Sequence, residues 1–226
     1  MEAPFVICLL TASITLVFAM SRECTVCQSS GKNCQGNKEA CSAPEDKCSI
    51  VSVEKNFGPT KHATKRSCID PEECTKGLAV LDMGKNQILQ GYLSCCEDHQ
   101  CTNHFSLPAR KIVTTNNKRC PACYTEPKEQ SGCQVEMINC TGEDETHCAE
   151  VFLQKKDGGK NMTTTMKGCA NKAFCEKMDI STIASPFTLL PSSNCKNATG
   201  AVDTTTGSLG LFLLAQAGLL LVTIFS

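Results

Sequence analysis

Cysteine is the residue that most constrains this chain. The sequence contains nineteen cysteines, and Cys8 lies in an apolar N-terminal stretch that is typical of a signal peptide and is removed with it. Eighteen remain, an even number, in a chain expected to enter an oxidising compartment. Because tryptophan is absent and aromatic residues make up only 5% of the chain, we expect small apolar cores that disulfides must support.

The spacing of the cysteines indicates a tandem duplication. In the first set, 2, 6, 6, 6, 19, 5, 20, 0 and 4 residues separate successive cysteines, and in the second set 2, 9, 6, 7, 20, 5 and 19. Agreement over seven intervals is typical of an internal repeat. We therefore expect one domain at 22–104, a polar and basic linker at 105–119, and a second domain at 120–197.

Two C-x-x-C pairs, Cys24/Cys27 and Cys120/Cys123, raise the alternatives of a zinc site and a redox site. A zinc ribbon brings two such pairs within about twenty residues of each other, whereas these pairs begin separate repeats. A redox pair is expected within a βαβ pattern, and neither pair has one around it. We expect disulfides here, with no metal ion and no cofactor.

The order of the cysteines resembles a known family. C-x2-C, further cysteines, C-x5-C and then CC-x4-C near an asparagine is similar to the lymphocyte-antigen-6/urokinase-receptor family. "CPACYTE" at 120–126 resembles the opening of the second domain of gamma-type phospholipase A2 inhibitors. The resemblance covers nearly the whole mature chain and implies an all-β, disulfide-rich fold class with two tandem three-finger domains. One departure is Thr102, which separates the final cysteine of the first repeat from Asn103.

The resemblance also implies a disulfide pairing, which spacing alone does not determine. In the first domain the implied pairs are Cys24–Cys48, Cys27–Cys34, Cys41–Cys68, Cys74–Cys95 and Cys96–Cys101. In the second domain they are Cys120–Cys148, Cys123–Cys133, Cys140–Cys169 and Cys175–Cys195. The second domain lacks both members of the last small loop, which keeps its number of cysteines even.

Turn signals mark the tips of the expected hairpins. "NFGP" at 56–59 and "KDGG" at 156–159 lie between β-rich arms, and a further turn is expected near "DMGKN" at 82–86. No stretch of the mature region has a convincing apolar period of 3.6 residues. Disulfides anchor the hairpin bases, so we expect the finger tips to be free to present binding residues.

The two ends of the chain indicate secretion and lipid anchoring. Residues 1–21 are interpreted as a signal peptide that is cleaved after Ala19 or Ser21. Residues 209–225 are apolar, and a polar spacer and a run of small residues precede them, which is typical of a glycosylphosphatidylinositol (GPI) signal. The expected attachment site is Asn197, with Gly200 as the alternative and 198–226 removed as a propeptide. A membrane-spanning tail is the competing hypothesis.

No motif of the sequence indicates catalysis, and we expect no enzyme. The acidic stretch "GEDETH" at 142–147 is interpreted as a solvated loop, and a net charge of −1 is not typical of nucleic-acid binding. The expected function is a GPI-anchored protein on the extracellular face of the cell membrane, with a shed or secreted form, that binds an extracellular protein ligand or receptor. The alternative is a secreted binding protein similar to phospholipase A2 inhibitors.

Candidate ligand-binding residues lie on the second finger of the first domain. Lys55, Lys61, Lys65 and Arg66 give this finger a basic character, to which the linker adds Arg110, Lys111, Lys118 and Arg119. These residues indicate either a patch for acidic partners, including sulfated glycans, or a solvated hairpin face.

Candidate N-glycosylation sites are the asparagines of three N-x-S/T sequons. They are Asn161 in "NMT", Asn139 in "NCT" and Asn197 in "NAT". Asn161 is the first choice, since Asn139 has a cysteine inside its sequon and Asn197 is also the expected anchor site.

Overall fold

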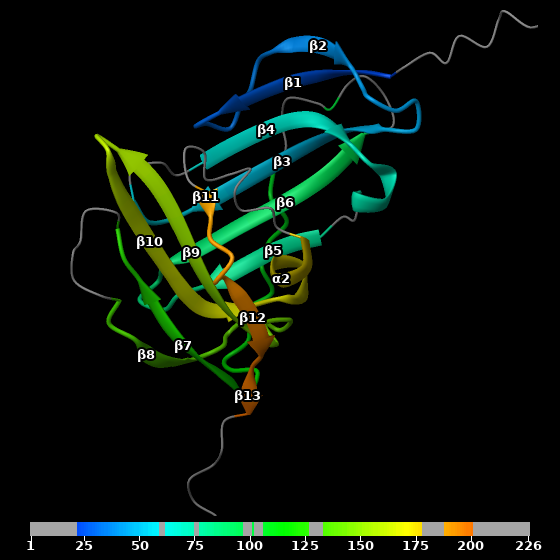
Figure 1. The fold of residues 1–226 in the computed structure, drawn as a ribbon. Coiled ribbons are helices and arrows are strands. Elements are labelled where there is room, and N and C mark those ends of the chain that lie inside the picture. The colour runs from blue at the N-terminus through cyan, green and yellow to red at the C-terminus, as the bar shows by residue number, and fades with distance from the viewer. Residues whose placement is uncertain are drawn as a thin grey trace, which may run out of the picture.

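The described residues form one antiparallel sheet of thirteen strands (Figure 1). The computed structural model describes residues 22–58, 62–74, 77–96, 101, 106–126, 133–177 and 188–200, so the expected signal peptide and apolar tail lie outside the described residues. The all-β, disulfide-rich fold class is confirmed. Two short helical segments interrupt the described strands, the 3-10 turn η1 (Pro71–Glu73) and the helix α2 (Lys172–Lys177).

The first repeat contributes six strands in the spatial order β5-β6-β3-β4-β1-β2. Their bounds are β1 Glu23–Ser29, β2 Asn37–Ala40, β3 Lys47–Lys55, β4 His62–Ile69, β5 Gly77–Asp82 and β6 Ile88–Cys96. The expected turn between β5 and β6 is present: Met83 N–H donates to Gln87 O at 2.9 Å, and Gln87 N–H donates to Gly84 O at 2.8 Å.

The second repeat contributes seven strands, of which β9 and β10 are the longest. The bounds are β7 Lys118–Tyr124, β8 Glu136–Asn139, β9 His147–Asp157, β10 Lys160–Ala170, β11 Thr188–Leu189, β12 Asn194–Asn197 and β13 Thr199–Gly200. Gly158 and Gly159 form the two-residue turn between β9 and β10 with φ of 55° and 81°. Positive φ at both positions is what a tight hairpin turn requires.

Nine disulfides join the same pairs of cysteines that the family resemblance implies, and each lies within one repeat. In the first repeat they are Cys24–Cys48, Cys27–Cys34, Cys41–Cys68, Cys74–Cys95 and Cys96–Cys101. In the second they are Cys120–Cys148, Cys123–Cys133, Cys140–Cys169 and Cys175–Cys195.

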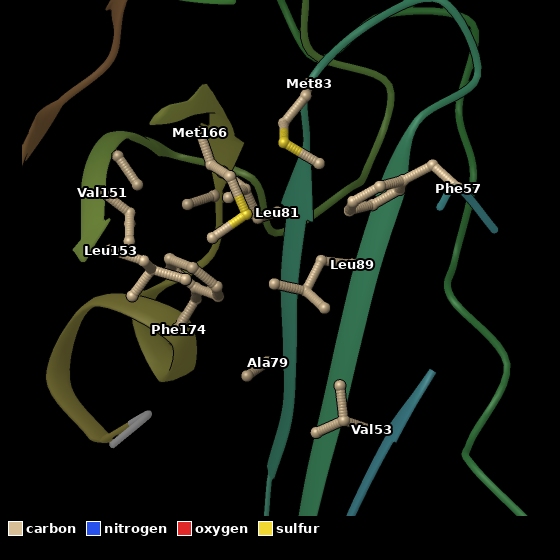
Figure 2. Close-up of a cluster of buried hydrophobic side chains, with 12 residues drawn as sticks. Val53, Phe57, Ala79, Leu81, Met83, Leu89, Val151, Leu153, Met166 and Phe174 are labelled. Atoms are coloured by element: carbon tan, nitrogen blue, oxygen red, sulfur yellow. The ribbon is translucent and has the colours of Figure 1, made fainter. Parts of the chain in front are cut away.

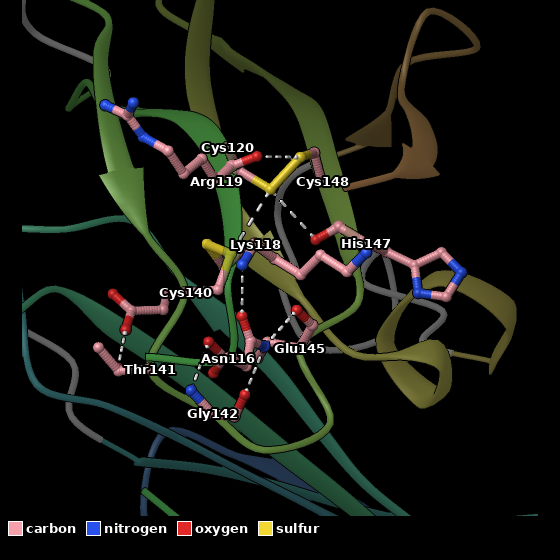
Figure 3. The surroundings of a disulfide bond; sticks show 12 residues. Asn116, Lys118, Arg119, Cys120, Cys140, Thr141, Gly142, Glu145, His147 and Cys148 are labelled. Carbon is pink, nitrogen blue, oxygen red and sulfur yellow. Dashed lines mark hydrogen bonds between the residues drawn. A yellow bond between two sulfur atoms is a disulfide. The ribbon is translucent and has the colours of Figure 1, made fainter. Parts of the chain in front are cut away.

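Two disulfides stack closely in each repeat. The sulfurs of Cys24 and Cys41 lie 3.3 Å apart, and those of Cys120 and Cys140 lie 3.8 Å apart (Figure 3). The sulfurs of Cys120, Cys140 and Cys169 lie within 4.8 Å of one another. Such a cluster would suit a metal ion if its sulfurs were thiolates, but each belongs to a disulfide.

One apolar core serves both repeats (Figure 2). From the first repeat, the buried members are Val53, Phe57, Ala79, Leu81, Met83 and Leu89. From the second repeat, they are Ala149, Val151, Leu153, Met166, Ala170 and Phe174. Since neither half alone would cover these side chains, the two repeats are packed together and not merely tethered by the linker.

The sheet runs from one repeat into the other through strands β5 and β10. Cys169 pairs with Asp82 and Ala170 pairs with Leu81 in antiparallel register. Gly168 permits this close approach, because a Cβ atom built on it would lie 2.0 Å from the backbone oxygen of Asp82. The requirement for glycine is therefore steric, and it belongs to the junction between the repeats.

Candidate binding surface

The second finger of the first repeat is the β3–β4 hairpin, and the described part of its tip packs against the second repeat. Phe57 is only 8% exposed, and its ring lies 4.6 Å from the ring of Tyr124, the last residue of β7. Lys55 Nζ lies 5.4 Å from the centroid of the Phe57 ring. The expectation that the finger tips are free is therefore wrong for this tip, because the apolar Phe57 next to the turn is covered by the second repeat.

The third finger of the first repeat is the β5–β6 hairpin, and it also packs against the second repeat near its tip. Met83 is almost fully buried in the shared core. At the turn, Lys85 Nζ lies 3.6 Å from a carboxylate oxygen of Glu136 on β8. Two of the three fingers of the first repeat thus contact the second repeat.

The three described members of the basic set predicted on the second finger, Lys55, Lys65 and Arg66, do not form one exposed patch. Lys65 and Arg66 are neighbours on β4, and successive residues of a strand point to opposite faces of its sheet. Arg66 is buried, Lys65 is half-buried, and Lys55 lies beside Phe57. Lys61 lies outside the described residues. A patch formed by these residues together is therefore not what the described part of the structure presents.

Arg110, predicted as part of a polar basic linker, is instead a buried link between the repeats. Its side chain is 6% exposed, and its Nη2 lies 2.8 Å from Asp82 Oδ2 and 2.6 Å from Glu145 Oε1. The same nitrogen donates to Thr141 Oγ1 at 2.8 Å. Asp82 ends strand β5 of the first repeat, so one guanidinium group joins carboxylates of both repeats.

The interpretation of "GEDETH" as a solvated loop is wrong for Glu145. Its side chain is fully buried, and Asn116 donates to its backbone oxygen at 2.9 Å (Figure 3). Burial raises the pKa of Glu145 above its ordinary value, while a hydrogen bond from Gly142 and the charge of Arg110 act in the opposite direction. The sequence indicated only that Arg110 is cationic. Its acidic partners, Asp82 and Glu145, lie far from it along the chain, so the ion pairs could not be predicted.

Asn171 is a second polar link between the repeats that the sequence analysis missed. Its Oδ1 accepts from Val80 N–H at 3.1 Å, and its Nδ2 donates to Leu78 O at 2.6 Å. Nδ2 also donates to Asp144 at 2.8 Å. Asn171 directly follows β10 and is buried, so its amide continues the pairing of β5 where the strand β10 ends.

The tip of the β9–β10 hairpin is exposed. Lys156, Gly158, Gly159 and Lys160 are exposed and Lys155 is half-buried. Side chains built on Gly158 and Gly159 would meet no atom within 4 Å. This tip thus carries lysines on both faces of a hairpin whose base is packed in the core, with Lys156 and Lys160 the most exposed. Among the described residues, it is the strongest candidate for contact with a partner.

The predicted glycosylation sites lie on strands and are accessible. Asn161 on β10 is exposed and pairs across the hairpin with Lys156. Asn139 on β8 and Asn197 on β12 are also exposed. Glycosylation at all three stays a prediction, and a glycan at Asn161 would stand beside the lysine-rich tip.

Among the described residues, none of the helices has the length and apolar character needed to cross a bilayer.

The comparisons with known proteins bear on the whole of this architecture. Residues 22–103 match the phospholipase A2 inhibitor family. The chain is 28% identical to phospholipase A2 inhibitor PIP of Malayopython reticulatus, over 73% of this chain and 80% of that protein. It is 27% identical to a gamma-type phospholipase A2 inhibitor of Gloydius brevicaudus siniticus, over 88% and 97% respectively. The chain is therefore similar to the gamma-type phospholipase A2 inhibitors over most of its length.

A solved structure, that of mouse TEX101, aligns with 79% of this chain at 19% identity and a TM-score of 0.36. The relationship to the phospholipase A2 inhibitors confirms the predicted family resemblance and supports an extracellular, non-catalytic binding protein. The chemistry of the described surface is consistent with this function, because hairpins held by disulfides offer contact area and charge to a partner.

Proposed function

We propose that this chain is an extracellular protein that binds a secreted phospholipase A2. The observation that carries the proposal is the extent of the similarity to curated phospholipase A2 inhibitors, which spans 80% and 97% of the two relatives compared above. Both repeats are included in these alignments. Because the repeats share one core and one sheet, the two-repeat unit is the part that would bind.

The β9–β10 hairpin is the element proposed to contact the enzyme. Its tip carries Lys155, Lys156 and Lys160. The β3–β4 and β5–β6 hairpins are weaker candidates, because Phe57 and Met83 near their tips are buried. Lysines on an exposed tip favour a partner with an acidic face and accelerate its association at low salt. Binding at this tip should therefore weaken as ionic strength rises.

The test uses the full chain expressed in mammalian cells and a panel of secreted phospholipase A2 enzymes. Surface plasmon resonance measures binding, and hydrolysis of phospholipid vesicles measures inhibition. The triple variant K155S/K156S/K160S should bind at least tenfold more weakly at low salt, with most of the change in association rate. The matched control K38S/K111S/K172S removes three exposed lysines elsewhere and should bind like the unmodified chain. Failure of every enzyme in the panel to bind would refute the proposal.

We propose in addition that a GPI anchor holds the protein at the cell surface. The support is the order of small residues, polar spacer and apolar tail at the C-terminal end of the sequence. Treatment of expressing cells with a phosphatidylinositol-specific phospholipase C should release the protein into the medium. Retention on the cells would favour a membrane-spanning tail.

A further inference from the structure

Ala198, Thr199 and Gly200 are the last three described residues, and they form part of the second repeat. Strand β13 pairs with the first strand of that repeat, Thr199 opposite Arg119 and Gly200 opposite Lys118. In Figure 1, β12, β13 and β7 lie together at one end of the molecule. The last described residues thus return to the start of the repeat.

Ala198 holds this closing segment in place. It is 7% exposed and packs in a cluster with the buried cysteines Cys120, Cys140 and Cys169. Its N–H donates to Thr146 O at 2.9 Å. A buried side chain next to two disulfides and a paired backbone are features of a folded element and not of a segment that is discarded.

Cleavage after Asn197 would remove all of these contacts. The apolar cluster around Cys120 would lose Ala198, and the backbone at Lys118 and Arg119 would lose its β13 partner. Asn197 on β12 itself pairs with His147 on β9, so an anchor at Asn197 would end the chain within this paired region. Gly200 is the last residue of β13, so an anchor at Gly200 keeps all of these contacts.

We infer that the GPI anchor is attached at Gly200 and that Asn197 stays in the mature protein as an N-glycosylation site. This inference rests on the proposed anchor. Gly200 is small, as an attachment residue must be, and it is followed by Ala201. With Gly200 as the attachment residue, the spacer before the apolar tail has only six residues, and the bulky Val202 lies two positions after the site. Both features fit the usual signal less well than attachment at Asn197 does. The contacts of 198–200 outweigh this difference. With Thr199 retained, the sequon of Asn197 is complete.

The experiment identifies the residue that carries the anchor. The full chain is expressed in mammalian cells, released with the phospholipase C, deglycosylated and digested with trypsin, which cuts after Lys196. Mass spectrometry should find the peptide 197–200 with the ethanolamine-linked glycan remnant of the anchor on Gly200 and a deamidated Asn197. Ethanolamine on Asn197, or on any other residue, would overturn the inference while leaving the anchor intact. An unprocessed peptide that contains 201–226, with no release from cells, would overturn the proposed anchor itself and the inference with it.

Two substitutions give an independent readout. A side chain at Gly200 would meet only Asn117 O, at 3.9 Å, so Gly200→Leu should fold normally and yet lose at least nine-tenths of the phospholipase-releasable surface protein. Asn197→Leu should keep the surface level and lose one glycan. The reverse pattern, with anchoring lost in Asn197→Leu and kept in Gly200→Leu, would contradict the assignment.

Discussion

Replacement of Arg110 by methionine should weaken the contact between the two repeats. Methionine keeps much of the side-chain volume but leaves Asp82 and the buried Glu145 without their cation. Each ion pair is worth about 4 kcal/mol at 4 Å and an effective dielectric constant of about 20. Desolvation and the repulsion between the carboxylates offset part of this, so we expect a loss of about 3–5 kcal/mol at pH 7.

The assay is thermal unfolding with the disulfides intact, followed by circular dichroism at pH 7 and pH 5. For a chain of this size the expected loss lowers the Tm by roughly 6–20 °C. The loss should shrink at pH 5, because without Arg110 the buried Glu145 takes up a proton more readily. The double variant R110M/E145Q should regain part of the stability.

The matched control is Lys111→Met at the next position. Lys111 is 83% exposed and lies 3.5 Å from the exposed Glu143, so its loss should change the stability by less than about 0.5 kcal/mol. If Arg110→Met unfolds within about 1 kcal/mol of the unmodified protein at pH 7, or if adding Glu145→Gln destabilises it further, the reasoning about a buried link is refuted.

Three further predictions concern the same junction. Gly168→Ala should force β10 away from β5 and cost about 1–3 kcal/mol in chemical denaturation, whereas Gly31→Ala, which has open space around it, should be nearly neutral. Asn171→Ala leaves buried backbone groups of β5 without partners, and each should lower the free energy of unfolding by about 1–3 kcal/mol. The control Asn194→Ala, at an exposed position, should not change the free energy of unfolding. Equal losses of stability in the two variants would contradict the proposed role of Asn171. Because the pKa of Glu145 is raised in the folded state, its contribution to stability is present at low pH and is lost as the pH rises through the folded pKa. The difference in unfolding free energy between the protein and Glu145→Gln, measured from pH 4 to 8, should follow that direction, and an opposite slope would disprove it.

The features that the sequence predicts well are local ones. The repeated cysteine spacing predicts two similar units, and "KDGG" predicts a hairpin turn because Asp-Gly accepts positive φ. In the structure the turn is there, with the positive φ at Gly158 and Gly159. The six residues of α2 are too few to show a helical period. The absence of a convincing helical pattern in the sequence is therefore compatible with this short element.

The junction between the repeats could not be predicted, since its determinants are far apart in sequence. The pairing of β5 with β10 depends on two strand edges whose compatibility leaves no periodic pattern. Phe57 and Tyr124 are each ordinary aromatic residues until the fold brings their rings together. Charge alone was also misleading, because the charged side chains of Arg110 and Glu145 form an ion pair in the interior and are not solvated.

Each of the nine crosslinks closes on its own half of the molecule, and this has a consequence for a protease that cuts the connecting segment before Arg110. The nicked protein would still migrate as one particle in gel filtration under native conditions, since strand pairing, apolar contact and the guanidinium link persist. In detergent without any reductant it would separate into two bands. A blot that shows half-length fragments would thus be no proof that the halves had ever parted in solution.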